Sequence, residues 1–260
     1  MSRERRRLLI EPQRLAPLRE RGGSLPLEDG ELHYLVRVLR RRPGDAVALI
    51  DGCGGLWGAR LGGGPWLEKV RLEVQEGLPP AGTPTLTLAL ALPRQEVELV
   101  WRMATELGID RLQPLRSERC QVQGRAPLER WRTVVREATE QCERLWLPPL
   151  AEVSEASPWL QHPRADLALF ATTRHRDLPS LEQVLAQQGG LRRRGGSEVT
   201  LAIGPEGGWS PSEEEGASGA GWLPISLGET ILRSATAAVA GVSRLCAWRG
   251  AAGPLPRDAG

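Results

Sequence analysis

The spacing of the hydrophobic residues changes partway along this chain of 260 residues. In the first part, short apolar runs predict strands over residues 7–10, 46–50, 56–61 and 70–74. A helix is predicted over residues 28–41. Its apolar positions, three and four residues apart, are Leu32, Leu35, Val36 and Leu39. This pattern predicts a β-rich N-terminal part.

A linker is predicted where Gly and Pro residues gather over residues 77–84. The hydrophobic pattern differs on its two sides, so we expect a domain boundary there. The sequence therefore predicts one domain over residues 1–76, a second over 85–250 and a flexible tail over 251–260.

Beyond the linker, strand-like and helix-like patterns alternate. Nearly continuous apolar runs predict strands over residues 86–92, 111–115, 167–171, 199–203 and 223–227. Apolar residues at helical spacing predict helices over residues 97–107, 128–145, 178–187 and 234–248. Strands that alternate with helices in this way are typical of an α/β domain built on a mainly parallel sheet.

The charge of the chain is unevenly distributed. The net charge is +2, but residues 1–42 contain eleven Arg and six Asp or Glu, a local balance of +5. A basic N-terminal segment favours contact with a polyanion, and Arg37, Arg40, Arg41 and Arg42 are the candidates for phosphate contacts. The alternative is a solvated surface rich in arginine, because Lys69 is the only lysine of the chain and Arg replaces Lys generally.

Several classes of protein are disfavoured by composition. No apolar run approaches the roughly 18 to 20 residues that span a bilayer, and only three apolar residues follow the charged N-terminus. We therefore expect a cytoplasmic protein without a membrane partner. The four cysteines and three histidines are scattered, so neither a disulfide framework nor a metal site is expected.

Candidate chemistry lies in two loops that follow predicted strands, because ligands of open parallel sheets bind beyond the carboxyl ends of the strands. The loop GPEGG over 204–208 has glycines that let the backbone approach a ligand closely. Its one ionisable residue, Glu206, could bind a hydroxyl or ammonium group or accept a proton. The alternative is a tight strand-to-helix connection with a solvated carboxylate.

The second loop, LGETILRS over 227–234, places Arg233 directly before a predicted helix rich in small residues. Arg233 could reach an anion or an RNA phosphate. The alternative is an arginine that only flanks a helix, with Ser234 as its cap. The small residues of the helix suit close packing, against this chain or a second subunit. Other cofactor patterns are absent from the sequence: GxGxxG after the first strand of this domain, GxxxxGK[ST] and GxSxG.

Six short motifs in this order resemble one family. They are LHYLVRVLR with PGD (32–40, 43–45), ATELG (104–108), SER (117–119), EATEQC (137–142), IGPEGG (203–208), and LG with ILR (227–228, 231–233). The chain is similar throughout to the ribosomal RNA small subunit methyltransferase E family of the SPOUT superfamily.

The resemblance implies an activity and a fold. Members of the family use S-adenosylmethionine to methylate N3 of a uridine in the decoding region of 16S rRNA. It implies a PUA-like β-barrel that helps to bind RNA, a parallel sheet with a C-terminal trefoil knot, and a homodimer. The partner is thus the small ribosomal subunit and not DNA. The donor-binding positions carried over are Ala171, Thr172, Gly204, Glu206, Gly207, Gly208, Leu227, Gly228, Ile231, Leu232 and Arg233.

The chain departs from the family pattern at several positions. Arg94-Gln95 stands where the family has Lys-Gly, so Arg94 is a further candidate for RNA contact. Ala235 replaces a Glu, which removes one carboxylate from the region of the site. We expect Arg233 to stabilise a uracil anion and Glu206 to take the proton or bind the donor. The pair Glu118 and Arg119 is a second candidate for catalysis.

Two other functions remain open from the sequence. One is a non-catalytic RNA-binding or ribosome-assembly protein with the same fold, a possibility raised by Ala235 and the lost lysines. The other is a related knotted methyltransferase that acts on tRNA, which the match over the N-terminal part disfavours.

Overall fold

The computed structural model describes residues 7–76, 83–121, 124–163, 165–173, 175 and 177–251. Contacts within the chain form two compact units, one of residues 1–78 and 136–147, the other of residues 79–135 and 148–260. Most of the predicted linker and tail, residues 77–82 and 252–260, lies outside the described residues.

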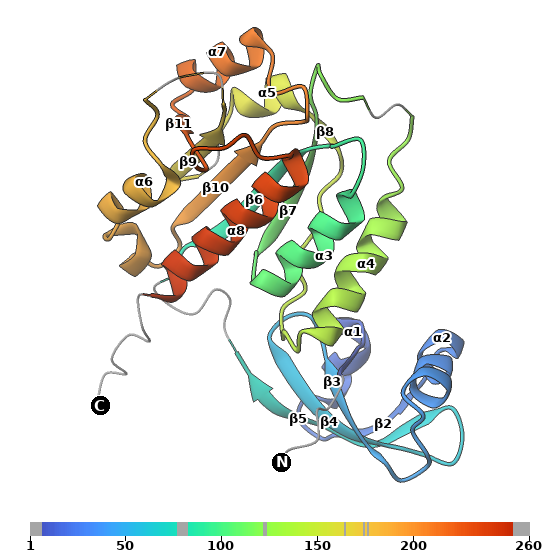
Figure 1. The fold of residues 1–260 in the computed structure, drawn as a ribbon. Helices are drawn as coiled ribbons and strands as arrows, with labels where there is room; N and C mark the ends of the chain where they lie inside the picture. The colour runs from blue at the N-terminus through green and yellow to red at the C-terminus, as the bar shows by residue number, and fades with distance from the viewer. Residues whose placement is uncertain are drawn as a thin grey trace, which may run out of the picture. The chain divides into compact units, whose positions relative to one another are not determined.

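The first unit is built on a five-stranded sheet in the order β1-β3-β4-β5-β2 (Figure 1). The strands are β1 (Arg7–Leu9), β2 (Gly23–Pro26), β3 (Ala46–Ile50), β4 (Gly55–Leu61) and β5 (Trp66–Gln75). β1 is parallel to β3 and the other pairs are antiparallel. The four strands predicted from the sequence are confirmed. β2 was not predicted, because its sequence, GSLP, contains one buried residue.

The helical elements of this unit are short. They are α1 (Pro12–Leu15), the 3₁₀ turn η1 (Ala16–Leu18), α2 (Asp29–His33) and the π-helix η2 (Tyr34–Val38). The helix predicted over 28–41 thus ends earlier and changes form at Tyr34. A π-helix has a wider turn than an α-helix, so the expected apolar face is not kept: Leu35 is buried but Val36 is 41% exposed. The prediction that Val36 faces the core was wrong.

Residues 136–147 pack with the first unit, although the sequence pattern predicted them within a continuous domain over 85–250. They comprise the end of α4 (Leu128–Gln141) and the segment after it. The Glu140 carboxylate accepts the Leu9 N–H at 2.9 Å, and Arg136 donates to the Leu9 carbonyl. These bonds satisfy backbone groups of β1 at the edge of the sheet.

The second unit is built on a six-stranded sheet in the order β11-β9-β10-β6-β7-β8, with parallel pairing throughout. The strands are β6 (Thr85–Ala91), β7 (Arg111–Arg116), β8 (Ser154–Glu155), β9 (Leu167–Ala171), β10 (Glu198–Ile203) and β11 (Leu223–Ile225). The prediction of an α/β domain with a parallel sheet is confirmed. β8 escaped prediction because a strand of two residues has no readable periodicity.

Helices cover both faces of this sheet (Figure 1). They are α3 (Val97–Leu107), α5 (Ala156–Leu160), α6 (Leu181–Gln187), α7 (Pro211–Gly219) and α8 (Ser234–Gly250), with the 3₁₀ turn η3 (Leu191–Arg193). α8 lies against β10, β6, α3 and α6. Its small residues pack within the chain: Ala238 is fully buried, and a Cβ at Gly241 would lie 2.5 Å from Leu201 Cδ2.

The close approach of α8 to the sheet predicts a cost for a large side chain at Gly241. Gly241→Leu should lower the free energy of unfolding by about 1 to 3 kcal/mol, because Leu201 is buried and has little room to move. Urea unfolding measures the difference. The control is Ala247→Leu at an exposed position of the same helix, and equal stabilities of the two variants would contradict the prediction.

Burial raises the pKa of the Glu140 carboxyl above its ordinary value of 4.5, against the opposing effects of the Leu9 N–H and Arg136. A raised folded-state pKa means that the folded chain holds this proton more tightly than the unfolded chain. The free energy of unfolding of the native protein, relative to that of Glu140→Gln, should therefore fall as the pH rises from 4.5 to the raised value. Chemical unfolding from pH 4 to 7 tests this, and a relative stability that rises with pH would refute it.

Candidate functional site

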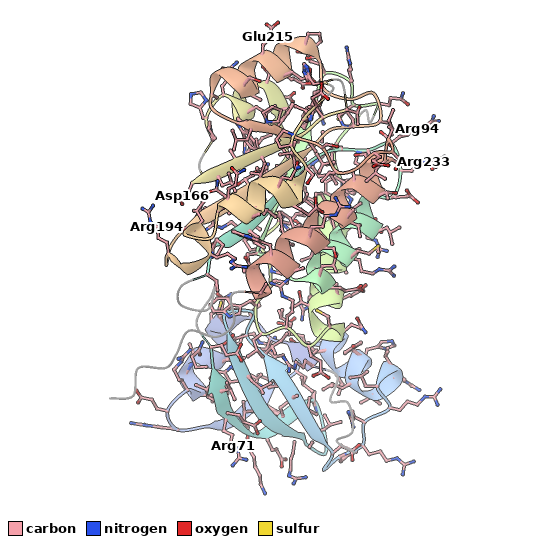
Figure 2. All side chains as sticks on the ribbon, turned by 60° about the vertical axis from the view of Figure 1, so that its left-hand side comes forward. Arg71, Arg94, Asp166, Arg194, Glu215 and Arg233 are labelled. Atoms are coloured by element: carbon pink, nitrogen blue, oxygen red, sulfur yellow. The ribbon has the colours of Figure 1, made fainter. Side chains whose placement is uncertain are left out.

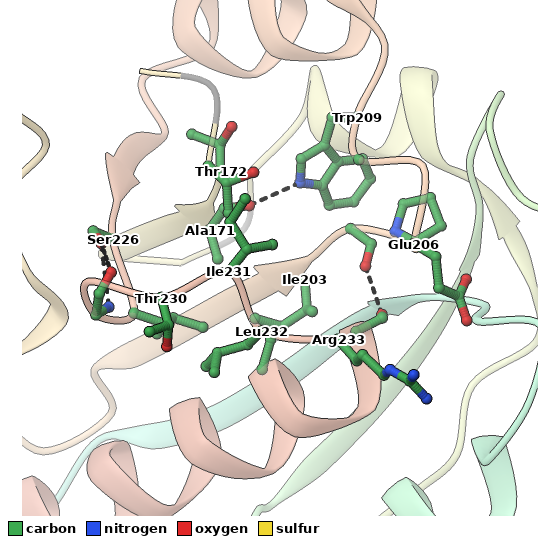
Figure 3. A pocket seen from close by; sticks show the side chains of 18 residues that line it. Ala171, Thr172, Ile203, Glu206, Trp209, Ser226, Thr230, Ile231, Leu232 and Arg233 are labelled. Carbon is green, nitrogen blue, oxygen red and sulfur yellow. Dashed lines mark hydrogen bonds between the residues drawn. The ribbon is translucent and has the colours of Figure 1, made fainter. Parts of the chain in front are cut away.

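The loops that follow β9, β10 and β11 meet at one end of the second sheet. These parallel neighbours end in a common row, because Ala171 pairs with both Ile203 and Ile225. The loops enclose a pocket of about 250 Å³ (Figure 3). It is lined by Ala171, Thr172, Thr173, Ile203, Gly204, Pro205, Glu206, Gly208, Trp209, Ser226, Leu227, Gly228, Thr230, Ile231, Leu232, Arg233, Ser234 and Ala237.

The structure thus brings the expected donor-binding residues to one place, with the exception of Gly207. Gly207 lies in the same loop but does not line the pocket. A Cβ at Gly207 would lie 3.1 Å from the Arg119 Cβ, so this glycine allows the loop to pack on the segment after β7. The two loops singled out from the sequence therefore form opposite parts of one cavity.

The loop over 204–209 is held by its tryptophan. The Trp209 Nε1–H donates to the Ala171 carbonyl at 3.1 Å (Figure 3). The Trp209 ring also stacks on Phe170 with centroids 5.0 Å apart. Gly208 has φ +67°, a left-handed conformation that glycine adopts without strain, and its N–H donates to Pro205. These contacts fix the loop over the end of β9. A capping box of Ser210 and Glu213 begins α7, with Pro211 at the first helical position.

The second loop is tied to the first by Ser234. Its hydroxyl donates to the Gly204 carbonyl at 2.6 Å (Figure 3), so Ser234 does not cap α8 as the alternative interpretation of this loop would have it. Gly228 has φ +139° and exchanges hydrogen bonds with the Ser226 hydroxyl. The Ile231 side chain is 83% exposed although it lines the pocket. At the mouth of the pocket, Ile231 offers apolar area that a ligand could cover.

Glu206 and Arg233 lie at the rim of the pocket. Both are exposed, and Figure 3 shows the guanidinium of Arg233 and the carboxylate of Glu206 on the same side of the pocket, away from Ser226. The Glu206 carboxylate accepts the Arg94 backbone N–H at 3.0 and 3.3 Å, which holds the segment after β6 at this rim. Arg233 has no ion-pair partner among the described residues, so its charge is available for an anion.

Glu118 and Arg119 do not line the pocket. Arg119 donates from Nη1 to the carbonyls of Gly207 and Trp209, at 3.2 and 2.9 Å. Glu118 accepts the Ser212 hydroxyl at 2.8 Å. Both side chains contact the loop over 204–209 and the start of α7, an arrangement that suits positioning of the loop better than contact with reacting atoms.

A polar group that the sequence did not single out supports the wall of the pocket. Thr172 donates its hydroxyl to Glu214 at 2.7 Å, and the other Glu214 oxygen lies 3.4 Å from His175 Nε2. The Glu214 side chain is 14% exposed, so it is a largely buried carboxylate directed at the pocket wall. Glu214 follows the capping-box glutamate Glu213 in α7, and no local sequence pattern indicates its contact with Thr172.

The candidate RNA-binding arginines lie in the first unit, apart from Arg94. Arg37 is in η2, and Arg40, Arg41 and Arg42 follow it. Arg40 has φ +53°, which turns the chain after the helix. Within the described parts of the chain none of these four arginines forms an ion pair, so their charge is not neutralised locally.

Neither a membrane-spanning helix nor a metal-binding cluster is found among the described residues. No helix there is long and apolar enough to cross a membrane. No group of three or more His, Cys, Asp or Glu side chains in that part of the chain could hold a metal ion.

Most of the chain is similar in sequence to known RNA methyltransferases. A family model described as an RNA methyltransferase domain matches residues 81–246, and one described as an RNA methyltransferase PUA domain matches residues 27–64. The ribosomal RNA small subunit methyltransferase E of Synechocystis sp. is 36% identical, over 92% of this chain and 76% of that protein. The protein of the same name from Rickettsia conorii is 34% identical, over 84% and 86%.

A solved structure is similar to this chain over nearly its whole length. The ribosomal RNA small subunit methyltransferase E of Neisseria gonorrhoeae, bound to S-adenosylmethionine, superposes with a TM-score of 0.76 at 25% identity. The superposition covers 93% of this chain and 97% of that one.

The contacts of Arg119 predict that the loop over 204–209 depends on it. Arg119→Met removes both donors and should raise the hydrogen-exchange rates of amides in this loop. Stability should fall by about 1 to 3 kcal/mol, because two carbonyls lose their partners. Arg102→Met, on the exposed face of α3, is the control. Unchanged exchange in the loop would show that Arg119 does not hold it.

Proposed function

The chain belongs to the ribosomal RNA small subunit methyltransferase E family, and we propose that it uses S-adenosylmethionine to methylate N3 of one uridine in the decoding region of 16S rRNA. The pocket carries this proposal. Its lining contains all but Gly207 of the residues that the family resemblance assigns to the donor, most of them in the segments GPEGG and LGETILR. The relative from Neisseria gonorrhoeae binds the same donor.

The residues of the pocket fit the chemical parts of S-adenosylmethionine. Ile203, Leu227, Ile231 and Leu232 offer an apolar surface for a flat adenine ring. The backbone at Gly204 and Gly228 can approach the ligand closely, and Thr172 and Glu206 offer oxygens to its hydroxyl and ammonium groups. When bound, the donor supplies a methyl group already activated by a sulfonium.

The protein therefore has two tasks: to position the uracil against the methyl group of the donor and to exclude water. Methyl transfer to uracil N3 would require that N3 be held next to the bound donor and that the N3 proton leave. A base paired in a helix cannot expose N3, so the substrate is a flipped or unpaired uridine. Arg233 at the rim stabilises the negative charge that develops on the uracil. Glu206, on the same side, accepts the proton directly or through water. Ala235 supplies no carboxylate, and Glu206 is the one carboxylate among the residues that line the pocket.

The finer features of the fold belong to the same proposal. We expect a trefoil knot in the second unit: the segment after β11 pairs with the segment after β9 through Ser226 and Pro179 and then returns to Gly204 through Ser234. We expect the first unit to close as a PUA-like barrel, the protein to be a homodimer, and the complex with small subunits to form in the cytoplasm.

The test of this function is a methylation assay. Purified protein and S-adenosylmethionine are incubated with 16S rRNA, and with small subunits, that lack the modification, and nucleosides are mapped by mass spectrometry. N3-methyluridine at one position in the decoding region is expected. Donor binding without methyl transfer would favour an assembly protein. Methylation of tRNA would favour the other knotted enzyme.

Arg233 is predicted to act in the chemical step. Arg233→Ala should lower kcat by about 100-fold, because a charge that stabilises a developing anion is lost. Donor affinity by calorimetry should change much less. Arg233→Lys should recover part of the rate, and Arg102→Ala, at an exposed position in the same unit, should keep it. Full turnover by Arg233→Ala would remove Arg233 from the mechanism.

Glu214 is predicted to act through Thr172 on donor binding. Glu214→Gln disturbs the hydrogen bond that orients the Thr172 hydroxyl and should weaken S-adenosylmethionine binding about tenfold, the value of one hydrogen bond. Thr172→Val should weaken it similarly, and the double variant should be little worse than either single variant. Additive losses would show that the two residues act separately.

A further inference from the structure

The outer face of the first unit's sheet carries a basic hollow apart from the donor pocket. It has a volume of about 380 Å³ and is lined by Ala46, Val47, Gly58, Ala59, Arg60, Lys69, Arg71 and Glu73. We propose that this hollow is a phosphate-binding site for the RNA substrate, continuous with the arginines that follow η2. This inference rests on the proposed function, because it concerns how the rRNA is held.

The strand register explains why cations surround a floor of small residues. Ala48, Gly58 and Arg71 form one cross-strand row, and Ala46, Arg60 and Glu68 form the next. Ala46 on β3 and Gly58 on β4 have little or no side chain, and the Glu73 carboxylate lies over Gly58, where a Cβ would clash with it. Arg60, Lys69 and Arg71 have long side chains that line the hollow, each of them exposed. A phosphate can therefore approach the sheet at Ala46 beside these cations, while at Gly58 it would have to displace the Glu73 carboxylate.

A bulge in β5 turns the cations outward. Between the pairs Gly58↔Arg71 and Arg60↔Glu68, β5 has one residue more than β4, and Lys69 has φ +53°. Without the extra residue, the alternation that buries Leu67 would direct Lys69 and Arg71 to the core. With it, Val70 is fully buried and both cations lie on the outer face. Figure 2 shows Arg71 projecting from the sheet.

The cations of the hollow are only weakly neutralised. Glu73 is the one carboxylate among the lining residues, and it lies 3.9 Å from Arg71, whose side chain is 76% exposed. An exposed ion pair of this length contributes little and leaves most of the charge to a ligand. Arg60 and Lys69 have no ion pair within the described residues. The local balance is therefore positive, which suits a polyanion.

The hollow is continuous with the predicted phosphate contacts. Arg60 donates to the Gly44 carbonyl at 2.7 Å, and the Gly44 N–H donates to Leu61 at the end of β4. The Arg42 N–H in turn bonds to Asp45. The loop that carries Arg41 and Arg42 thus borders the hollow. One RNA strand could contact the loop and the hollow together. The two contacts would bind a longer stretch of phosphates than the arginines of the loop alone.

The experiment measures binding of full-length protein to a 16S rRNA transcript over a range of salt concentrations. The triple variant Arg60→Ala/Lys69→Ala/Arg71→Ala should bind on the order of 100-fold more weakly near 0.1 M salt, with a slope of log K against log salt flatter by about 2. Ala46→Glu, which adds a carboxylate to the floor and removes no bond, should also weaken binding. Glu73→Gln should strengthen it several-fold.

A matched control removes the same charge elsewhere. Arg111→Ala/Arg130→Ala/Arg194→Ala takes three arginines from ion pairs of the second unit and should change the salt slope little. Donor binding by each variant shows that the pocket is intact. Equal losses in the triple variant and the control would overturn the proposed site, since net charge alone would then explain them.

The remaining outcomes separate this inference from the proposed function. If native protein methylates the transcript and the hollow variants bind it as tightly as native protein, the hollow is not an RNA site and the function stands. If the variants fail only on assembled subunits while they bind the transcript normally, the hollow contacts a protein and the inference is wrong. If native protein neither binds nor methylates rRNA, the function itself fails.

Discussion

The site depends on the alignment of three parallel strands whose carboxyl ends share one row. Ala171, Ile203 and Ile225 lie side by side, so the three loops after them must leave the sheet at the same place. Two hydrogen bonds then join the loops, from Trp209 to Ala171 and from Ser234 to Gly204. Both bonds are accepted by backbone carbonyls. The shape of the pocket is therefore set by the backbone of the loops and does not depend on a bound ligand. Arg119 and Glu214 reinforce that path from outside.

Much of this arrangement could be predicted from the sequence, because it rests on local patterns. Apolar runs located β6, β9 and β10, and glycines marked the loop over 204–208. The partners of the loops could not be predicted, since they come from distant segments. The Ser234 hydroxyl looks like a helix cap in sequence, and only the fold brings it to Gly204. Glu214 is one of three consecutive glutamates, and only the position of α7 selects it.

The first unit shows a second limit of periodicity. The bulge at Lys69 adds one residue to β5, and the π-helix that begins at Tyr34 has more residues per turn than an α-helix. Each feature shifts the periodicity and so changes which side chains face outward. Val36 is exposed for this reason, and Lys69 and Arg71 share a face with Arg60. Backbone and apolar side chains thus form most of the pocket lining in the second unit, and Arg60, Lys69 and Arg71 are exposed together on one face of the first.

The central claim is that the pocket holds the methyl donor for modification of a uracil. It is tested most directly by incubating unmodified small subunits with the protein and isotopically labelled S-adenosylmethionine, followed by nucleoside mapping of the 16S rRNA. The account predicts labelled N3-methyluridine at a single position, lost in Arg233→Ala. Label on a ribose, on tRNA or on no nucleoside at all would contradict it.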